Sequence, residues 1–270
     1  NPSGQHIELG ISEMNLFMAL SQFGLAQEMA GQHLVPIGTV YDPFVCRGLD
    51  ALIYALYVGA KVIFAGTPAG VSLSPEGGAH QSTVTPSLGI ELPGVRFYEP
   101  AFAYEVEWLL LDAIARCSDR VNGSSTYLRL STKAIDAGLA AAVRERISEE
   151  QLRADVLAGG YRLVDWTVDA PDLDARDVVQ IAVGGIMAPE AVAAAKRLHA
   201  EGVAANVLVV TSAERLFSDL RASRKRSLAD VHARSMMGHL ERLIPANERR
   251  APIVTVQDGA SHSLAFLGSA

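Results

Sequence analysis

Cysteine and long apolar runs are both scarce in this chain of 270 residues. Its two cysteines, Cys46 and Cys117, are too few for a disulfide framework or a cysteine zinc site, so we expect a reducing, cytoplasmic setting. The longest apolar run, residues 51–65, is interrupted by Gly59 and Lys61 and is too short to cross a bilayer. The sequence therefore predicts neither a disulfide-stabilised secreted domain nor a membrane partner.

Positive charge is limited as well. The chain has 23 Lys and Arg against 30 Asp and Glu, which gives a formal net charge of −7. A balance of this sign argues against general nucleic-acid binding. The one basic cluster, residues 221–226, has acidic neighbours and no interleaved aromatic residues, and is typical of a solvated helix. We therefore predict no nucleic-acid partner.

Apolar residues, by contrast, make up 49% of the chain and fall into two kinds of segment. Short β-branched runs predict strands at residues 34–40, 61–65, 95–98, 126–130, 161–166, 178–183, 206–211 and 252–256. Longer segments predict helices at residues 12–30, 44–58, 103–117, 139–157, 189–200 and 228–243. The segment 139–157 is rich in alanine and charge, so we expect it to be exposed. Continuously apolar strands that alternate with helices are typical of parallel sheets covered on both faces.

The predicted fold class is α/β, with two doubly wound domains of mainly parallel sheets joined by a linker. The length suits two domains. The character of the sequence changes between residues 132 and 177, and we place the domain boundary near residues 135–160. We expect the first domain to span residues 1–135, the linker residues 136–160, and the second domain residues 161–270.

One carboxylate stands at the start of the first predicted helix, in the stretch QHIELGISEMNLFM. An extended run, residues 6–9, meets Gly10, and Ser12 then opens an apolar helical pattern. Ser12 is a favoured N-cap residue, and an acidic residue in a first turn interacts well with the helix dipole. Taken alone, Glu13 needs no role beyond helix electrostatics.

Two further stretches carry candidate site residues. GTVYDPFVCRGLD places Tyr41 and Phe44 around a helix start, where they form either a flat wall for a planar ring or part of the core. GTPAGVSLSPEGGAHQST is a long loop rich in Gly, Pro and Ser, and long loops in compact domains often carry function. Its His80 lies beside paired glycines and is either an ordinary surface histidine or a group that exchanges a proton with a substrate.

In this order and spacing, the three stretches resemble the pyrimidine-binding (Pyr) domain of the transketolase superfamily of thiamine diphosphate enzymes. GISEMN is similar to the strand–Glu–helix signature of that superfamily, and EGGAHQS to its loop with a substrate-facing histidine. PAFAYEVEWLLLDAI, GTVYDPF and VTSAERL are similar to the homodimeric pyruvate dehydrogenase E1 branch. The resemblance continues into a transketolase C-terminal-like domain, with the first Pyr strand expected to be missing and the last domain to be truncated.

The resemblance implies roles for four residues. Glu13 would hydrogen-bond N1′ of the aminopyrimidine of thiamine diphosphate. Tyr41 and Phe44 would line that ring, and His80 would contact the substrate carboxylate. For Arg47 a structural salt link is as good an interpretation as a site role. The superfamily binds the diphosphate and Mg²⁺ through a G-D-G…N motif, which these 270 residues lack, so no metal ligand is predicted here and the fragment alone would be inactive.

The function implied is that of a thiamine diphosphate-dependent 2-oxo acid dehydrogenase E1 component. Such an oxidoreductase decarboxylates pyruvate and passes the acyl group to a lipoyl carrier. The implied partners are a second copy of the chain, bound through the apolar helices of the first domain, the missing diphosphate-binding domain and a lipoyl acyltransferase component. Two alternatives stay open: transketolase-like ketol transfer between sugar phosphates, and a non-catalytic subunit that uses the fold to dimerise.

Overall fold

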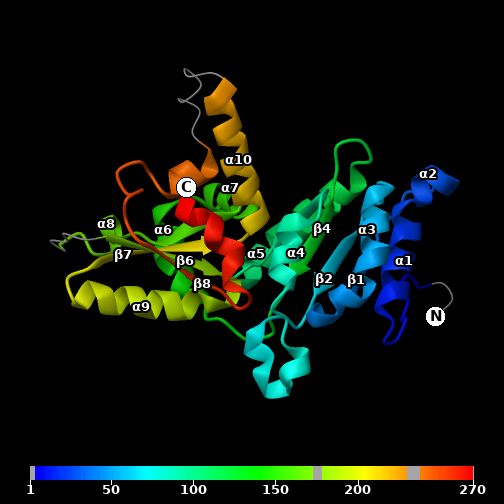
Figure 1. Cartoon of the computed structure of the whole chain (residues 1–270), viewed down its shortest axis with the longest axis horizontal. Helices are drawn as coiled ribbons and strands as arrows, with labels where there is room; N and C mark the ends of the chain where they lie inside the picture. The colour runs from blue at the N-terminus through cyan, green and yellow to red at the C-terminus, as the bar shows by residue number, and fades with distance from the viewer. Residues whose placement is uncertain (1–3, 173–177, 230–237, 270) are drawn as a thin grey trace.

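The computed structural model describes residues 4–172, 178–229 and 238–269 and contains two four-stranded sheets side by side (Figure 1). Sheet A is wholly parallel, in the order β1 (Ile37–Val40), β2 (Ile63–Gly66), β4 (Ser125–Arg129) and β3 (Val95–Tyr98). Sheet B has the order β5 (Gly160–Val164), β7 (Ala204–Val210), β6 (Val178–Gly184) and β8 (Ile253–Val256), and only β5 runs antiparallel to its neighbour. We refer to the parts of the chain that carry these sheets as the sheet A half and the sheet B half.

Helices lie between and around the strands. In the sheet A half they are α1 (Glu13–Gly24), α2 (Ala26–Ala30), α3 (Leu49–Tyr57), α4 (Thr85–Glu91) and α5 (Ala103–Ser118). Further along the chain, after the sheet A half, the helices are α6 (Ala141–Arg146), α7 (Glu149–Ala158), α8 (Trp166–Asp169), α9 (Ala188–Ala200), α10 (Ala213–Ala229) and α11 (His239–Leu243). Short 3₁₀ helices are η1 (Asp42–Gly48), η2 (Val71–Glu76), η3 (Gly78–His80), η4 (Ala137–Ala140), η5 (Gly185–Met187) and η7 (Ser261–Ser269). The predicted α/β class, with two doubly wound and mainly parallel sheets, is confirmed.

Sheet A buries both of its faces, because successive side chains of a strand point to opposite sides. On β2, Phe64 packs edge-on against Phe17 of α1, with ring centroids 5.2 Å apart, in a cluster that α3 completes. The preceding residue, Ile63, points the other way and packs with Ala113 and Cys117 of α5. Helices α1 and α3 therefore cover one face of the sheet, and α5 lies on the other.

Sheet B is covered in the same way. Ile181 and Val183 of β6 pack in the cluster that contains the inner face of α9, whereas Ala182 between them packs with α10 and α11. The α9 cluster also includes Leu109 of α5 and Leu128 of β4. The apolar core is therefore continuous from one sheet to the other, which holds the two halves together.

Near the N-terminus, two predictions of regular structure are wrong in part. Residues 6–9 form no strand, and the helix predicted at residues 12–30 ends at Gly24 before α2 begins. A Cβ on Gly24 would lie only 2.9 Å from the Lys61 carbonyl oxygen, so glycine is what allows the end of α1 to pack there. The helix predicted at residues 44–58 likewise begins as a 3₁₀ turn, η1, and becomes α-helical only in α3.

The segment 139–157, predicted as one exposed helix, instead forms α6 and α7 with buried inner faces. The Ser148 hydroxyl accepts a hydrogen bond in the first turn of α7 and so separates the two helices. Val143, Leu152 and Val156 are at most 1% exposed and lie in the core that the two sheets share. A few large apolar side chains on one face are thus enough to bury helices whose composition is dominated by alanine and charge.

Half of the helix predicted at residues 228–243 lies outside the described residues. Its first two residues belong to α10 and its last five to α11. Helix α10 begins at Ala213, and of its length only the basic cluster at residues 221–226 was expected to be helical before residue 228. The basic cluster at residues 221–226 lies on it, mostly exposed, as expected for a solvated helix.

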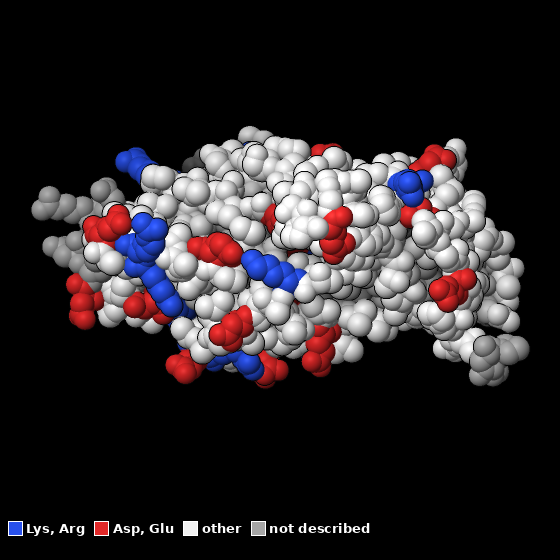
Figure 2. Space-filling model, turned by 90° about the horizontal axis from the view of Figure 1, so that it is seen from below, with Lys and Arg blue, Asp and Glu red and all other residues white. Residues whose placement is uncertain are grey.

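The surface shows no single dominant charge in the view from below. Figure 2 shows acidic and basic side chains beside one another on this face, rather than a continuous basic stripe. In the three described ranges of the chain, no helix is both long enough and apolar enough to cross a membrane.

Candidate functional site

The carboxyl ends of the strands of sheet A bring the candidate residues together. The chain leaves β1 into Tyr41 and η1, and it leaves β2 into the long loop that contains η2 and η3. Because the carboxyl ends of parallel strands lie at one edge of a sheet, both segments emerge there, where open α/β sheets usually bind ligands. In Figure 1 the loop is the cyan segment that projects below the sheets.

Three of the four predicted site residues form a ring cluster. The ring centroids of Tyr41 and Phe44 are 5.5 Å apart, with an angle of 30° between the planes. The His80 ring lies 5.5 Å from Tyr41 and 6.3 Å from Phe44 and is edge-on to both. These separations are in the range of favourable ring contacts. The long loop therefore brings its histidine against the aromatic pair.

The fourth predicted residue, Glu13, is linked to the ring cluster through Arg47. Arg47 Nη1 lies 3.6 Å from Glu13 Oε1, and the guanidinium carbon lies 4.6 Å from the centre of the Phe44 ring. One guanidinium thus makes an ion pair and a cation–π contact. Glu13 is the first residue of α1 and Ser12 occupies the N-cap position, as predicted, although the Ser12 side chain makes no capping hydrogen bond. Of the two interpretations of Arg47, the salt link is present, and Glu13 is its partner.

The contact between α1 and η1 depends on Gly48. A Cβ at this position would lie 2.3 Å from a ring carbon of Phe17 and 2.8 Å from the Glu13 carbonyl oxygen. No side chain fits in this space, so glycine allows the first turn of α1 to lie directly on the end of η1. Since Arg47 immediately precedes Gly48, this packing brings the Arg47 backbone within side-chain reach of Glu13.

Glu76 determines how His80 and Tyr41 are held, and the sequence analysis missed it. The Glu76 carbonyl oxygen lies 2.9 Å from His80 Nδ1, and a carbonyl can only accept, so Nδ1 carries the proton. In the neutral ring Nε2 then keeps its lone pair and can accept a proton. The Glu76 carboxylate accepts a hydrogen bond from the Tyr41 hydroxyl, which raises the pKa of Tyr41. The only signal in the sequence was that Glu76 shares a loop with His80.

Near the ring cluster lies a buried set of charges that the sequence analysis also missed; we call it the Arg129 group. Arg129 ends β4, and its Nε lies 3.1 Å from Oδ2 of Asp42, the first residue of η1. Asp42 also accepts hydrogen bonds from the hydroxyls of Thr85, at 2.7 Å, and Tyr127. Arg129 Nη1 lies 2.6 Å from Glu99 Oε1. These contacts fix the start of η1 to the edge of the sheet.

Burial disfavours the charged forms of the side chains in the Arg129 group, and their opposite charges act against this effect. It disfavours the charged guanidinium, but the neighbouring carboxylates of Glu99 and Asp42 outweigh burial and raise the pKa of Arg129. Burial also raises the pKa of Glu99, against the opposing effect of Arg129. The guanidinium therefore remains charged and holds the two carboxylates together.

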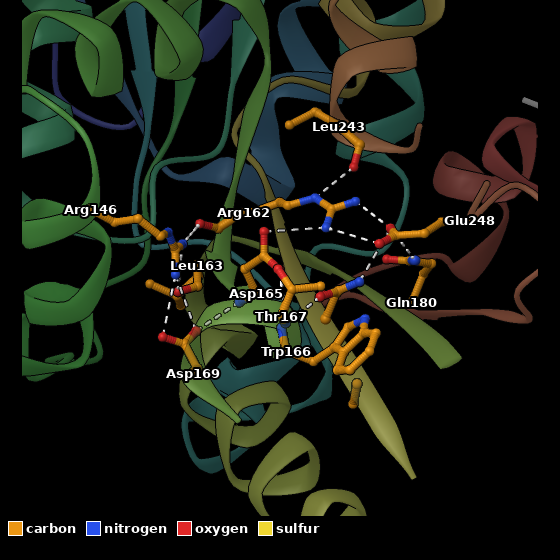
Figure 3. A network of polar contacts seen from close by, with 12 residues as sticks. Arg146, Arg162, Leu163, Asp165, Trp166, Thr167, Asp169, Gln180, Leu243 and Glu248 are labelled. Carbon is orange, nitrogen blue, oxygen red and sulfur yellow. Dashed lines mark hydrogen bonds and ion pairs between the residues drawn. The ribbon is translucent and has the colours of Figure 1, made fainter. Parts of the chain in front are cut away.

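A second polar network lies near the amino ends of β6 and β7, away from the candidate site (Figure 3). Arg162 of β5 forms an ion pair with Glu248 and donates to the Leu243 carbonyl at 2.9 Å. Glu248 also accepts from the Gln180 side chain at 3.0 Å. Its polar groups bond mainly to one another and none of the predicted site residues belongs to it, so we assign it a structural role.

In the described part of the chain, the residue types that bind metals do not cluster. Across residues 4–172, 178–229 and 238–269, no group of three or more His, Cys, Asp or Glu side chains is placed to hold a metal ion.

Comparison with known proteins gives two curated relatives, while no family profile matches. The pyruvate dehydrogenase E1 component of Mycobacterium tuberculosis is 27% identical over 259 residues, which cover 94% of this chain and 26% of that protein. A 6-deoxy-6-sulfo-D-fructose transketolase subunit from Clostridium sp. is 25% identical over 212 residues, which cover 77% of this chain and 55% of that subunit. The chain thus spans only part of each relative's length.

Solved structures share the fold over nearly the whole chain. Transketolase from Leishmania mexicana superposes with a TM-score of 0.67 at 22% identity, covering 96% of this chain and 31% of that one. A split-gene transketolase, described as an inactive β4 tetramer, superposes with a TM-score of 0.61 at 22% identity, covering 97% of this chain and 70% of that one. These structures show the shared fold, and the curated relatives show that the chain is similar to a pyruvate dehydrogenase E1 component and to a transketolase subunit, in agreement with its motifs.

Proposed function

We propose that this chain is the part of a thiamine diphosphate-dependent 2-oxo acid dehydrogenase E1 component that holds the aminopyrimidine ring and the substrate. The observation that supports this best is the assembly of the four predicted residues, with Arg47, at one edge of sheet A. The similarity to a pyruvate dehydrogenase E1 component favours pyruvate as the 2-oxo acid.

The residues present fit the aminopyrimidine ring. The Glu13 side chain is 12% exposed, so it is mostly covered but still reachable by a ring nitrogen. The faces of Tyr41 and Phe44 supply apolar surface for a planar ring. Arg47 lies over Phe44, but its side chain is 59% exposed and can swing into solvent when a ring enters.

Each residue has a defined task in this proposal. Thiamine diphosphate, when bound, supplies the electron sink for decarboxylation of the 2-oxo acid. Glu13 holds a proton at the pyrimidine N1′, and the aromatic pair orients the ring. His80 presents Nε2 toward the substrate, since its Nδ1 proton is held by the Glu76 carbonyl. The diphosphate and Mg²⁺ are held by residues outside this sequence, so the chain contributes one part of a shared site.

A second copy of the chain is the partner we propose for the outer face of α1 and α3. These helices lie against each other, and their outward side chains include large exposed apolar residues: Met14, Met18, Ile53, Tyr54 and Tyr57, from 39% to 85% exposed. Contiguous apolar surface of this kind marks protein interfaces. Sedimentation velocity at micromolar concentration is expected to show a dimer or larger assembly, and a monomer would contradict the proposal. A diphosphate-binding domain and a lipoyl acyltransferase component complete the proposed partners.

Transketolase-like ketol transfer is the second candidate function. Two observations favour it: the relative from Clostridium is a transketolase subunit, and the split-gene transketolase matches this chain over 97% of its length. Turnover of pyruvate with an artificial electron acceptor, compared with turnover of xylulose 5-phosphate and an aldose phosphate, separates the two. Both assays require the protein together with its diphosphate-binding part. Activity in neither assay would favour a non-catalytic subunit.

The test of the site uses Glu13→Gln and His80→Ala. Glu13→Gln is expected to slow hydrogen–deuterium exchange at C2 of thiamine diphosphate by about a hundredfold or more, the usual range for loss of a proton-transfer group. The control is Glu8→Gln, an exposed carboxylate in the same stretch, which should leave exchange unchanged. His80→Ala is expected to lower kcat/KM for pyruvate while C2 exchange stays normal. Near-normal C2 exchange in Glu13→Gln would refute the assignment.

A further inference from the structure

The loop that carries His80 is closed at its base. The Gly70 amide donates to Ser82 Oγ at 2.8 Å, and the Ser82 amide donates to the Gly70 carbonyl at 3.3 Å. Arg129 Nη2 donates to the Ser82 carbonyl at 2.9 Å, so the base is tied to the Arg129 group. Residues 70–82 therefore form a closed loop with its base fixed on sheet A, and His80 lies two residues before Ser82 at that base.

Asp258, from the sheet B half, holds this loop at a second point. It follows β8, at the carboxyl end of that strand, and is 7% exposed. Its Oδ1 accepts from the Ser72 amide at 2.8 Å, and its Oδ2 accepts from the Ser72 hydroxyl at 2.6 Å. Hydrogen bonds to a carboxylate are stronger than those between neutral groups. Both oxygens of one buried carboxylate are thus committed to a single residue of η2.

Gly70 lets the loop backbone pass directly beside the Asp258 carboxylate. Its φ of +105° is rarely adopted by residues with a side chain, and a Cβ would lie 1.8 Å from Asp258 Oδ2. The Asp258 carbonyl also accepts from Arg129 Nη2 at 2.9 Å. The backbone of Asp258 is therefore hydrogen-bonded to Arg129 of sheet A, and its side chain is hydrogen-bonded to the loop.

We infer that Asp258 is the positioning residue of His80. Ser72 and Glu76 lie on η2, so a displacement of η2 moves the Glu76 carbonyl and carboxylate with it. The carbonyl holds His80 Nδ1 and the carboxylate holds the Tyr41 hydroxyl, so both rings follow. The sheet B half thereby sets the placement of a group in the sheet A half. The effect on turnover rests on the proposed function, whereas the grip on the loop does not.

Amide hydrogen exchange and kinetics of the complete protein test this together. In Asp258→Asn and Asp258→Ala, exchange of amides in residues 70–82 is expected to rise by about tenfold or more, as for loss of a hydrogen bond to a charged group. Ser72→Ala removes only the hydroxyl bond and should give a smaller rise in a chain that keeps its fold. Asp172→Asn, an exposed aspartate in the sheet B half, is the control and should change nothing.

The kinetic readout separates positioning from a merely structural role. In the Asp258 variants kcat/KM for pyruvate is expected to fall about tenfold. C2 exchange of thiamine diphosphate should fall by a clearly smaller factor, since Glu13 is not part of the loop and only Tyr41 of the ring-binding residues follows η2. Unchanged exchange of residues 70–82 would overturn the inference. Faster exchange with normal pyruvate kinetics would overturn it as well, provided that His80→Ala is impaired. If His80→Ala is also normal, the proposed function fails and the grip of Asp258 on the loop stands.

Discussion

The two ends of η1 carry the same kind of ion pair in opposite surroundings. At its start the Asp42 side chain is fully buried, and its Arg129 partner is 5% exposed. Near its end the Arg47 side chain is 59% exposed and lies 3.6 Å from Glu13. Asp42 accepts further hydrogen bonds from Thr85 and Tyr127, whereas the bond to Glu13 is a single long contact. The pair of Asp42 and Arg129 is part of the buried structure beneath the candidate site, and the pair of Glu13 and Arg47 lies at the surface of that site.

The difference shows how one short element serves both as a frame and as a binding surface. A buried pair resists change because loss of either partner leaves a charge without compensation, at a cost of about 3–5 kcal/mol. An exposed pair is worth about 0–1 kcal/mol, so a ligand can replace it with little loss. The buried start of η1 therefore holds the aromatic pair in place, and its exposed end can exchange Arg47 for a bound ring.

The largest effect is expected when the buried pair is broken. Arg129→Ala leaves the Asp42 and Glu99 carboxylates buried without a cation, so the free energy of unfolding should fall by roughly 3–5 kcal/mol. Urea denaturation followed by circular dichroism measures this. Arg153→Ala, at an exposed position on α7, serves as the control and should stay close to the parent. A loss below about 1 kcal/mol would mean that Arg129 is no more than a surface pair.

Glu105 is a buried carboxylate whose hydrogen-bond partners are neutral, whereas the buried Asp42 and Glu99 have a cationic partner. Its oxygens accept from the Tyr161 hydroxyl and the Ala101 amide, each at 2.6 Å, and from the Phe102 amide at 3.3 Å. Burial raises its pKa from 4.5 to about 7, against the opposing effect of these hydrogen bonds. The folded state therefore keeps a proton that the unfolded chain has already released in this pH range.

The stability of the protein should consequently fall as pH rises through this window. The contribution of Glu105 is fully present below pH 4.5 and is lost as pH passes through about 7. Between about pH 5 and about pH 8 we expect a loss of roughly 2–3 kcal/mol, which Glu105→Gln should abolish. Urea denaturation across this range tests the prediction, with the exposed Glu107→Gln as the matched control. Parallel pH profiles for Glu105→Gln and the parent protein would contradict it.

The sequence predicted best what depends on local pattern. The strand at residues 95–98 has the bounds that the sequence suggested, because three of its four residues are β-branched or aromatic and such residues favour strands. The burial of residues 139–157 was missed, because it depends on how Val143 and Leu152 meet distant strands. Composition alone does not record such tertiary contacts.

The same division applies to the candidate site. Glu13, Tyr41, Phe44 and His80 stand in motifs and could be found from the sequence. Asp258 and its partner Ser72 are 186 residues apart, and no local pattern joins them. Arg129 is equally hidden, since any arginine at a strand end looks solvent-exposed until its carboxylate partners are placed. The residues proposed to touch a ligand were thus recognised from motifs, whereas those that hold them in position depend on the complete fold.

The smallest effect is expected at the exposed end of η1. Arg47→Ala removes a 59% exposed partner of Glu13, and such pairs change the free energy of unfolding by about 0–1 kcal/mol. Urea denaturation in low salt and in about 1 M NaCl checks this, because the Debye length falls to about 3 Å and any remaining difference from the parent should vanish. A loss above about 2 kcal/mol, or one that persists in high salt, would show that Arg47 belongs to the frame. The Glu13 carboxylate would then not be exchangeable with a ligand at low cost, and the contrast between the two ends of η1 would fail.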